Sequence, residues 1–274
     1  MSGRIAVGVD GSEESAAAVD WAADEAALRG AELRLVNASL WQEHAVVAVR
    51  PARDVRAQRA RDLLAAMNER ARSRRSGIAV SEEEVEDAPA TVLVSASRDA
   101  EMVVLGSLGL GTTAGFTAGS VGQEVAAGAH GPVVLVRGSA PQRGGRVVVG
   151  VDLRSAGEEP LRFAFDFAAR RSVPLRVVHT WHLTPLHPHK EEGTEAAREA
   201  LSEAVRPHRE RFPNVEVEVE ARAGRAAVHL AEEAAGAGIV VVGRRTAARG
   251  NHLGATAHAM IHHAACPVAV VPHT

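Results

Sequence analysis

A glycine-rich stretch, residues 103–121 (VVLGSLGLGTTAGFTAGSV), contains the residues best suited to hold a ligand. Its apolar start predicts a buried strand, its glycines predict a loop, and a helix is expected to begin at Gly119-Ser120 and to end before Gly131. The start of a helix presents unpaired backbone N–H groups and the positive end of the helix dipole, and glycine lets a backbone approach a ligand closely. The stretch is therefore predicted to bind an anion.

A carboxylate ends the first predicted strand of the chain. Residues 4–9 are mainly apolar, Asp10 follows them, and Gly11-Ser12 opens a helix. Ser12 is a favourable N-cap, and the two glutamates after it suit the positive end of the helix dipole. Asp10 either caps this helix or faces a ligand, and both interpretations stay open at this point.

Strands and helices are predicted to alternate through the first half of the chain. Apolar runs indicate strands, and longer polar stretches with apolar residues at helical spacing indicate helices. The expected strands cover residues 4–10, 33–38, 78–85, 103–106 and 132–136, and the expected helices begin at Ser12 and cover 54–74, 90–97 and 119–130. This order predicts an α/β fold, with a parallel sheet that has helices on both faces.

The same order begins again in the second half. Residues 149–152 repeat the sequence VGVD of residues 7–10 at an offset of 142, and Gly243 aligns with Gly106 at an offset of 137. Helices are expected over 194–211 and 225–235, and strands over 215–219 and 239–242. A repeat this long indicates duplication of a domain of roughly 140 residues. The predicted domains are residues 1–138 and 146–274, joined by a linker over 139–145.

Composition restricts the class of protein. The chain has 274 residues, 46% of them apolar, a formal net charge of −3 and one cysteine. Nucleic-acid binding needs a basic face, which this charge does not favour. A single cysteine excludes an intrachain disulfide, and there is neither a secretory leader nor an apolar run of about 18 residues. We therefore expect a cytoplasmic protein with no nucleic-acid or membrane partner.

The spacing Gly106, two residues, Gly109, nine residues, Gly119-Ser120 resembles the nucleotide-binding loop of the ATP-binding universal stress proteins. Each half also has an opening strand that ends in Gly-Val-Asp and a closing strand introduced by proline, so the resemblance covers nearly the whole chain. The chain is similar to a tandem universal stress protein with two such domains. The resemblance implies two doubly wound parallel five-stranded sheets with strand order 3-2-1-4-5, of the adenine nucleotide alpha hydrolase-like type.

That sheet order places a crevice at the carboxyl ends of strands 1 and 4, where ligands of doubly wound folds bind. Asp10 ends strand 1 and Gly106 ends strand 4, so Asp10 could accept a hydrogen bond from ribose or adenine, or help to place Mg²⁺. The phosphates would contact Gly106, Gly109, Gly119, Ser120 and Val121. By similarity to the family, the base and sugar would lie against Gly8, Val9, Ala38 and Leu105.

The second half departs from this pattern. Thr246 replaces the second glycine, and Ala255 replaces Ser120. Asp152 and Gly243 remain, and Arg244 with its neighbouring arginines could supply charge. The pattern predicts a weaker or altered second site, and the alternative is that the arginines lie in a solvated loop.

The sequence indicates a binding protein more than an enzyme. The glycines are followed by no Walker A lysine, and neither an arginine finger nor paired carboxylates are evident. The resemblance implies an ATP-binding protein of stress response or signalling, with its two domains paired through their last strands and with further pairing into a homodimer. The alternatives are a slow ATP hydrolase, a ligand-free interaction protein, and a binder of cyclic AMP or AMP on the same fold; no catalytic residue and no protein-bound metal site is assigned.

Overall fold

The computed structural model describes residues 3–38, 53–107, 118–137, 145–154, 158–181, 190–246 and 252–274. Their contacts divide the chain into two compact units, Met1–Ala140 and Pro141–Thr274. Each unit is an α/β domain, which confirms the predicted fold class. The linker predicted over 139–145 lies outside the described residues, apart from Gly145.

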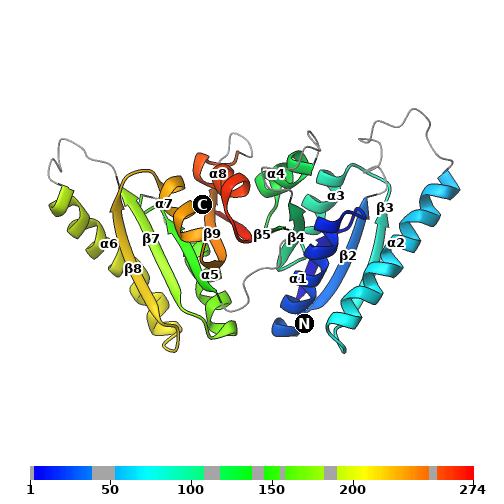
Figure 1. Ribbon diagram of the computed structural model, residues 1–274, viewed down its shortest axis with the longest axis horizontal. Coiled ribbons are helices and arrows are strands. Elements are labelled where there is room, and N and C mark those ends of the chain that lie inside the picture. Colours follow the sequence, from blue (N-terminus) through cyan, green and yellow to red (C-terminus); the bar gives the residue numbers. More distant parts are fainter. Residues whose placement is uncertain are drawn as a thin grey trace. The chain divides into compact units, whose positions relative to one another are not determined.

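The N-terminal unit contains a five-stranded parallel sheet. Its elements are β1 (Arg4–Gly8), α1 (Glu13–Arg29), β2 (Glu32–Ala38), α2 (Arg53–Arg74), β3 (Val80–Val85), α3 (Pro89–Ala96), β4 (Met102–Ser107), α4 (Ala118–Gly128) and β5 (Val133–Arg137) (Figure 1). The strand order is β3-β2-β1-β4-β5, and every neighbouring pair is parallel. The implied order 3-2-1-4-5 is confirmed here.

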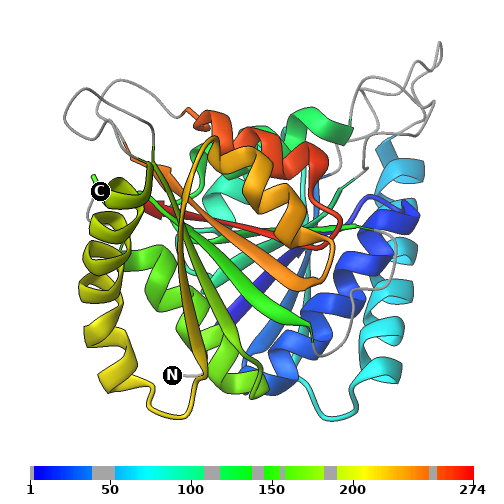
Figure 2. The ribbon, with the colours of Figure 1, turned by 60° about the vertical axis from the view of Figure 1, so that its left-hand side comes forward.

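The C-terminal unit repeats this architecture. Its elements are β6 (Arg146–Val151), α5 (Glu158–Arg171), β7 (Leu175–Trp181), α6 (Lys190–Arg211), β8 (Val217–Ala223), α7 (Ala226–Ala234), β9 (Ala237–Arg245), α8 (Ala255–His263) and β10 (Val268–His273). The order β8-β7-β6-β9-β10 corresponds to 3-2-1-4-5. Helices α7 and α8 pack side by side over the sheet (Figure 2).

Local sequence explains why the first elements begin and end where they do. Ser12 is the N-cap of α1 and accepts a hydrogen bond from the Ser15 N–H at 3.1 Å. Gly30 ends the helix at φ 63°, a left-handed conformation that suits glycine. The inner strands β1 and β4 are almost wholly buried, whereas the edge strand β3 alternates between exposed and half-buried residues. This pattern is expected for the centre and the edge of a sheet covered on both faces.

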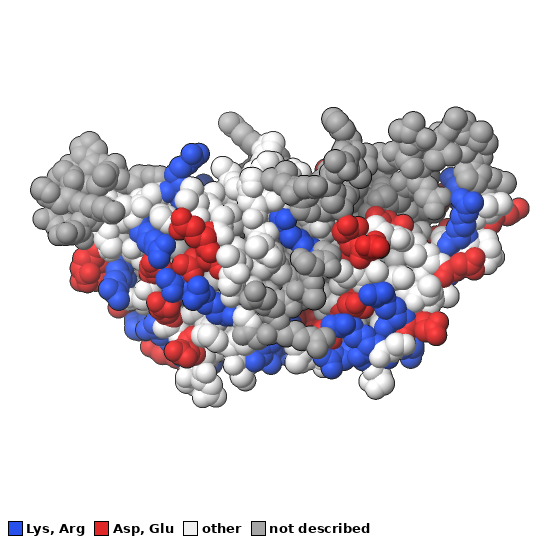
Figure 3. Space-filling model, viewed as in Figure 1, with Lys and Arg blue, Asp and Glu red and all other residues white. Residues whose placement is uncertain are grey.

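Charged side chains fasten the outer helices. Basic and acidic groups are interspersed on the face shown in Figure 3. Between α1 and α2, Arg70 pairs with Asp20 and Arg74 pairs with Asp24, each at 2.7 Å. The charge-rich helix α2 therefore serves partly as a structural cover for α1.

Two strands of the C-terminal unit differ from their predicted bounds. Strand β8 begins at Val217 because residues before it turn, with the Val215 N–H donating to the Phe212 carbonyl at 3.1 Å. Strand β9 extends to Arg245 because its last residues pair with the polar end of β10. Hydrophobicity alone marked the buried middle of β9, but only the first residues of β8.

Candidate functional site

The ends of β1 and β4 lie side by side in the N-terminal unit. Val7 pairs with Val104, so Asp10 and Ser107, each three residues further on, follow neighbouring strands at the same edge of the sheet. Helix α4 begins at Ala118, which puts Gly119, Ser120 and Val121 in its first turn. Gly109 lies outside the described residues. The predicted convergence of the two strand ends is present, and the ligand contacts of these residues stay predictions.

Asp10 organises the start of α1 and keeps one oxygen available. Its Oδ1 accepts hydrogen bonds from the Ser12 N–H at 2.9 Å and from the Ser12 hydroxyl at 2.6 Å. The same hydroxyl caps the helix, so the capping interpretation holds in an indirect form. The other oxygen, Oδ2, accepts no hydrogen bond from the part of the chain that the structure describes. A ligand or a hydrated ion could therefore use it without disturbing the helix cap.

Two predicted glycines have clear packing roles. A Cβ added at Gly106 would lie 2.4 Å from the carbonyl carbon of Glu14, in the first turn of α1. A Cβ added at Gly8 would lie 2.6 Å from Leu105 Cδ2. Val9, Ala38 and Leu105 are buried. Close packing against the backbone of α1 is thus a sufficient reason for glycine at 106, whether or not a ligand also contacts it, whereas the nearest neighbour of Gly8 is the end of a side chain on the adjacent strand.

One hydrogen bond is repeated in the two units with different residues. The Asn37 amide nitrogen donates to the Val9 carbonyl at 2.7 Å. His179, 142 positions later, places Nδ1 2.8 Å from the Val151 carbonyl. A carbonyl only accepts hydrogen bonds, so Nδ1 carries the proton, and in the neutral ring Nε2 is an acceptor. The two units thus support the end of their first strand with the same hydrogen bond, made by an amide in one unit and by an imidazole in the other. Only His179 has a second ring nitrogen, Nε2, that this bond does not use.

The C-terminal unit contains a cavity of about 1060 Å³ at the carboxyl ends of β6, β7 and β9. Its apolar wall includes Val178, Leu230 and Val242, and Trp181 lies at its side. Among the described residues, its charged lining consists of three arginines and a single carboxylate: Arg154, Arg225, Arg245 and Asp152. The cavity therefore favours an anion with an apolar or aromatic portion.

Asp152 is engaged by two of these arginines. Its Oδ1 accepts from the Arg154 N–H and from Arg154 Nε, each at 3.1 Å, and its Oδ2 lies 3.3 Å from Arg154 Nη2 and 3.7 Å from Arg245 Nη2. Partial burial raises the pKa of the Asp152 carboxyl, but these hydrogen bonds and charges outweigh it, so the pKa lies below its ordinary value. The Asp152 carboxylate is therefore charged and directed to arginine, whereas Asp10 accepts its hydrogen bonds from Ser12.

The departures from the glycine pattern have defined positions. Thr246 bonds the His273 carbonyl through its N–H at 2.8 Å and its hydroxyl at 2.9 Å. Arg244 is 2% exposed and lies outside the cavity lining, while burial lowers the pKa of its guanidinium. Gly254 is the N-cap of α8 without a side-chain cap, and the first turn of that helix lines the cavity. Strand alternation thus brings Arg245, next to the predicted Arg244, to the cavity.

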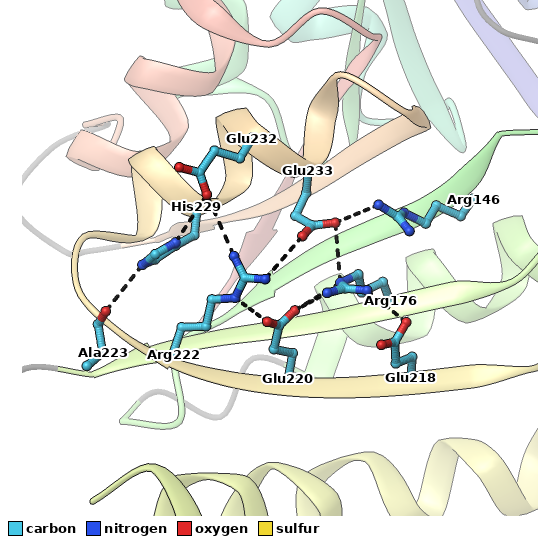
Figure 4. Close-up of polar contacts among 9 residues, drawn as sticks. All are labelled: Arg146, Arg176, Glu218, Glu220, Arg222, Ala223, His229, Glu232 and Glu233. Carbon is cyan, nitrogen blue, oxygen red and sulfur yellow. Dashed lines mark hydrogen bonds and ion pairs between the residues drawn. The ribbon is translucent and has the colours of Figure 1, made fainter. Parts of the chain in front are cut away.

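An ion-pair network holds helix α7, which forms one wall of the cavity. Glu233 of α7 pairs with Arg146 of β6 at 2.8 Å and with Arg176 of β7 at 3.3 Å (Figure 4). Arg176 and Arg222 both bond Glu220 of β8. Partial burial raises the pKa of Glu220, but its arginine partners lower it further, so the net shift is downward. The network therefore joins three strands to α7 and fixes the position of the wall.

Histidines are concentrated in the sequence at residues 179–189 and 258–263, a spacing that raises the question of a metal site. His258 and His262 have ring centroids 4.6 Å apart on α8, and His182, His187 and His189 lie outside the described residues. Within the described ranges, no group of three or more His, Cys, Asp or Glu side chains is placed to hold a metal ion. Among the same residues, no helix has the length and apolar character needed to cross a membrane.

Sequence reasoning missed two arginines and a tryptophan among the residues that line the C-terminal cavity. Arg154 follows Asp152 by two positions, Trp181 ends β7 beside β6, and Arg225 is the N-cap of α7. Their places at strand ends and helix starts on the carboxyl side of the sheet were a usable signal, because such positions face the crevice of this fold.

Comparisons with known proteins agree with this architecture. A universal stress protein of Mycolicibacterium smegmatis is 34% identical over 282 residues, which cover 97% of this chain and 96% of the relative. The crystal structure of a universal stress protein from Archaeoglobus fulgidus covers 100% of both chains with a TM-score of 0.74 at 18% identity. The crystal structure of a universal stress protein in complex with cAMP covers 50% of this chain and 98% of its own, with 29% identity and a TM-score of 0.40. The profile of the Universal stress protein family matches residues 1–137 and 145–272, and the chain therefore belongs to this family in a tandem, two-domain form.

Proposed function

We propose that this universal stress protein binds ATP with Mg²⁺ in its N-terminal unit and acts in stress response or signalling. The observation that carries the proposal is the position of Asp10, which has an available Oδ2 beside the end of β4. Helix α4 begins after the connection from that strand, so its first N–H groups belong to the same edge of the sheet. A carboxylate, a glycine-rich connection and a helix start are together suited to a nucleotide phosphate chain.

The residues present also fit a nucleotide-bound magnesium ion. Mg²⁺ is usually held by one or two carboxylates together with substrate phosphates and several waters. Asp10 would be that carboxylate, directly or through a water, because its Oδ1 already holds the start of α1. When bound, Mg²⁺ would neutralise phosphate charge. The chain itself would orient the nucleotide by the first turn of α4 and keep the base against the buried end of β2.

The test is to count the nucleotide that the purified protein carries. The full chain is denatured, and the released nucleotide is identified by chromatography with mass spectrometry, followed by titration of nucleotide-free protein with ATP and Mg²⁺. We expect to find about one ATP bound per chain, and we expect this binding to require the N-terminal unit. Thermal stabilisation by ATP with Mg²⁺ should follow the binding relation for a ligand of the native state.

Asp10→Asn is the informative variant, because asparagine keeps an acceptor for Ser12 but removes the charge. Binding of ATP with Mg²⁺ should weaken by about tenfold or more, as for loss of a charged hydrogen bond. Asp152→Asn, its repeat partner, is the matched control and should retain that binding. Equal loss in both variants, or none in Asp10→Asn, would contradict the proposal. The homodimer expected from the resemblance is checked separately by sedimentation velocity.

A further inference from the structure

We propose that helix α8 carries a metal site on its solvent-facing side, in which His258 and His262 together bind a divalent transition-metal ion, Ni²⁺ or Cu²⁺. The inference uses other residues than the ATP proposal and does not rest on it. It follows from the spacing of the two histidines, the distance between their rings, and their place on the helix.

The two histidines lie one helical turn apart on the same face. Residues i and i+4 of an α-helix are neighbours on its surface, and His258 and His262 have this spacing in α8. The opposite face of the helix is packed, because Ala257, Met260 and Ile261 are buried. His258 is exposed and His262 is half-buried. Packing therefore holds the helix in place while an ion from solvent can reach the histidine pair.

The separation of the two rings suits a single ion. Their centroids are 4.6 Å apart, and their planes are tilted by 54°. A metal–nitrogen bond of about 2.1 Å, with the ring centre about 1.1 Å behind the nitrogen, puts each centre about 3.2 Å from the ion. Two such rings at about 90° have centres about 4.5 Å apart, and at the tetrahedral angle about 5.2 Å apart. The observed separation therefore corresponds to ligands at a right angle.

The ligand type and this angle select the class of ion. Imidazole is a good ligand for Cu²⁺, Ni²⁺ and Zn²⁺, whereas Mg²⁺ prefers oxygen. Ligands at a right angle favour the tetragonal or square-planar geometry of Cu²⁺ and Ni²⁺ over the tetrahedral geometry of Zn²⁺. Among the residues that the structure describes, no third His, Cys, Asp or Glu is placed to join the pair. Water would fill the remaining positions, so the site is an open one that exchanges its ion.

The end of α8 favours a cation. His262 lies in the last turn, where the unpaired carbonyl groups form the negative end of the helix dipole. The helix sequence ATAHAMIHH contains neither lysine nor arginine, so no fixed positive charge on α8 itself opposes a metal ion. His263 is also in the last turn, but its ring centroid is 6.4 Å from that of His262. It therefore does not share the arrangement of the pair.

A bound ion would stabilise a short helix. Helix α8 has 9 residues, and a helix of this length is marginal without tertiary contacts. An ion held by His258 and His262 joins two successive turns and so opposes their separation. The residues from Gly254 to Ala257 line the cavity of the C-terminal unit. Metal binding should therefore also reduce the local opening of this part of the cavity wall.

The test follows the hydrogen exchange of α8 peptides in the full chain. Ni²⁺ should slow the amides that exchange through local unfolding of α8, because that unfolding separates the two ligands. At a Ni²⁺ concentration tenfold above its dissociation constant, the relation for a ligand of the native state gives about tenfold slower exchange. Mg²⁺ at the same concentration should leave the exchange unchanged. The readout is local, so Ni²⁺ bound by histidines elsewhere in the chain does not contribute to it.

Matched variants identify the ligands. His258→Gln and His262→Gln each leave one imidazole and should weaken Ni²⁺ binding at α8 by about tenfold or more, because the second ligand no longer binds within the same molecule. His263→Gln changes the neighbouring exposed histidine and should behave like the parent. Exchange in EDTA reports whether each variant folds normally, and the exposed His258→Gln decides the test if His262→Gln alters the helix there. No slowing by Ni²⁺, slowing that persists in His258→Gln, or an equal loss in His263→Gln would each overturn the proposal.

Discussion

Gly106→Ala is expected to destabilise the N-terminal unit through a contact far from it in sequence. The added Cβ would lie 2.4 Å from the carbonyl carbon of Glu14, 2.5 Å from its oxygen and 2.7 Å from the Ser15 nitrogen. All three atoms are backbone atoms in the first turn of α1, so no side-chain rotation can relieve the overlap. To reach an ordinary contact of 3.4 Å, the nearest pair must separate by 3.4 − 2.4 = 1.0 Å. Strand β4 and helix α1 must therefore move apart.

The cost of that movement can be bounded. Overpacking a close contact typically costs about 1–3 kcal/mol, and a rigid backbone neighbour favours the upper part of this range. Replacing glycine also lowers the conformational entropy of the unfolded chain, which offsets about 0.4–1 kcal/mol of the lost stability. A net loss of about 1–2 kcal/mol is therefore expected. For an m-value of about 2 kcal/mol/M, the urea midpoint of the N-terminal unit falls by about 0.5–1 M.

The assay should resolve the two units, because a chain with two compact units need not unfold in one step. Hydrogen exchange of peptides from α1, followed along a urea series, reports the N-terminal unit directly. Gly243→Ala, the repeat partner, should cost less, because its Cβ meets the His273 ring and Pro160 instead of backbone. Gly236→Ala enters open space and should change stability by less than about 0.5 kcal/mol. Wild-type stability of Gly106→Ala with loss of ATP binding would refute the packing argument and assign this glycine to the ligand.

Three further outcomes are expected. Asn37→Ala leaves the carbonyl at the end of β1 without its donor and should cost about 1–3 kcal/mol in urea unfolding, whereas Asn37→His should recover most of it. Burial lowers the pKa of His208, which stacks on Phe165, so stability should be full above the ordinary histidine pKa of about 6.5 and fall as the pH drops through and below that value. His208→Phe should flatten this part of the pH profile of thermal unfolding. Glu233→Gln should cost about 1–3 kcal/mol in urea unfolding of the C-terminal unit, and the exposed Glu218→Gln less than about 1 kcal/mol.

The sequence predicted the order of elements better than their contacts. Alternating apolar runs and helical stretches are local, so the βα order and the internal repeat could be recognised without a structure. The adjacency of strands 1 and 4 came only from the family resemblance, because strand order depends on pairing between residues far apart. Gly106 shows the limit for single residues: its nearest neighbour is Glu14, and no local pattern predicts that contact.

In the candidate sites too, local sequence predicted which residues end a strand, but not the contacts that those residues make. Asp10 at the end of the first strand was predictable, whereas its hydrogen bonds to Ser12 depend on the exact turn. The sequence offered Arg244 and its neighbouring arginines together, because two adjacent arginines on one strand face opposite sides and sequence alone does not say that Arg245 is the one that lines the cavity. The pairing of the two units and of two chains stays a prediction.

The pairing of β1 with β4 has a consequence for the time course of folding. Ile5 pairs with Met102, which is 102 − 5 = 97 residues later, while Arg4 pairs with Glu32 after only 32 − 4 = 28 residues. Closing the longer loop costs about 1 kcal/mol more chain entropy, so the β1–β2 pair should form before β1–β4. On the ribosome, β4 emerges only after about a hundred residues have been made, well after β1 and β2. The paired ends of β1 and β4 beside Asp10 are thus expected to be among the last features of their unit to assemble, so a nascent chain would gain the proposed nucleotide site only once that unit is nearly complete.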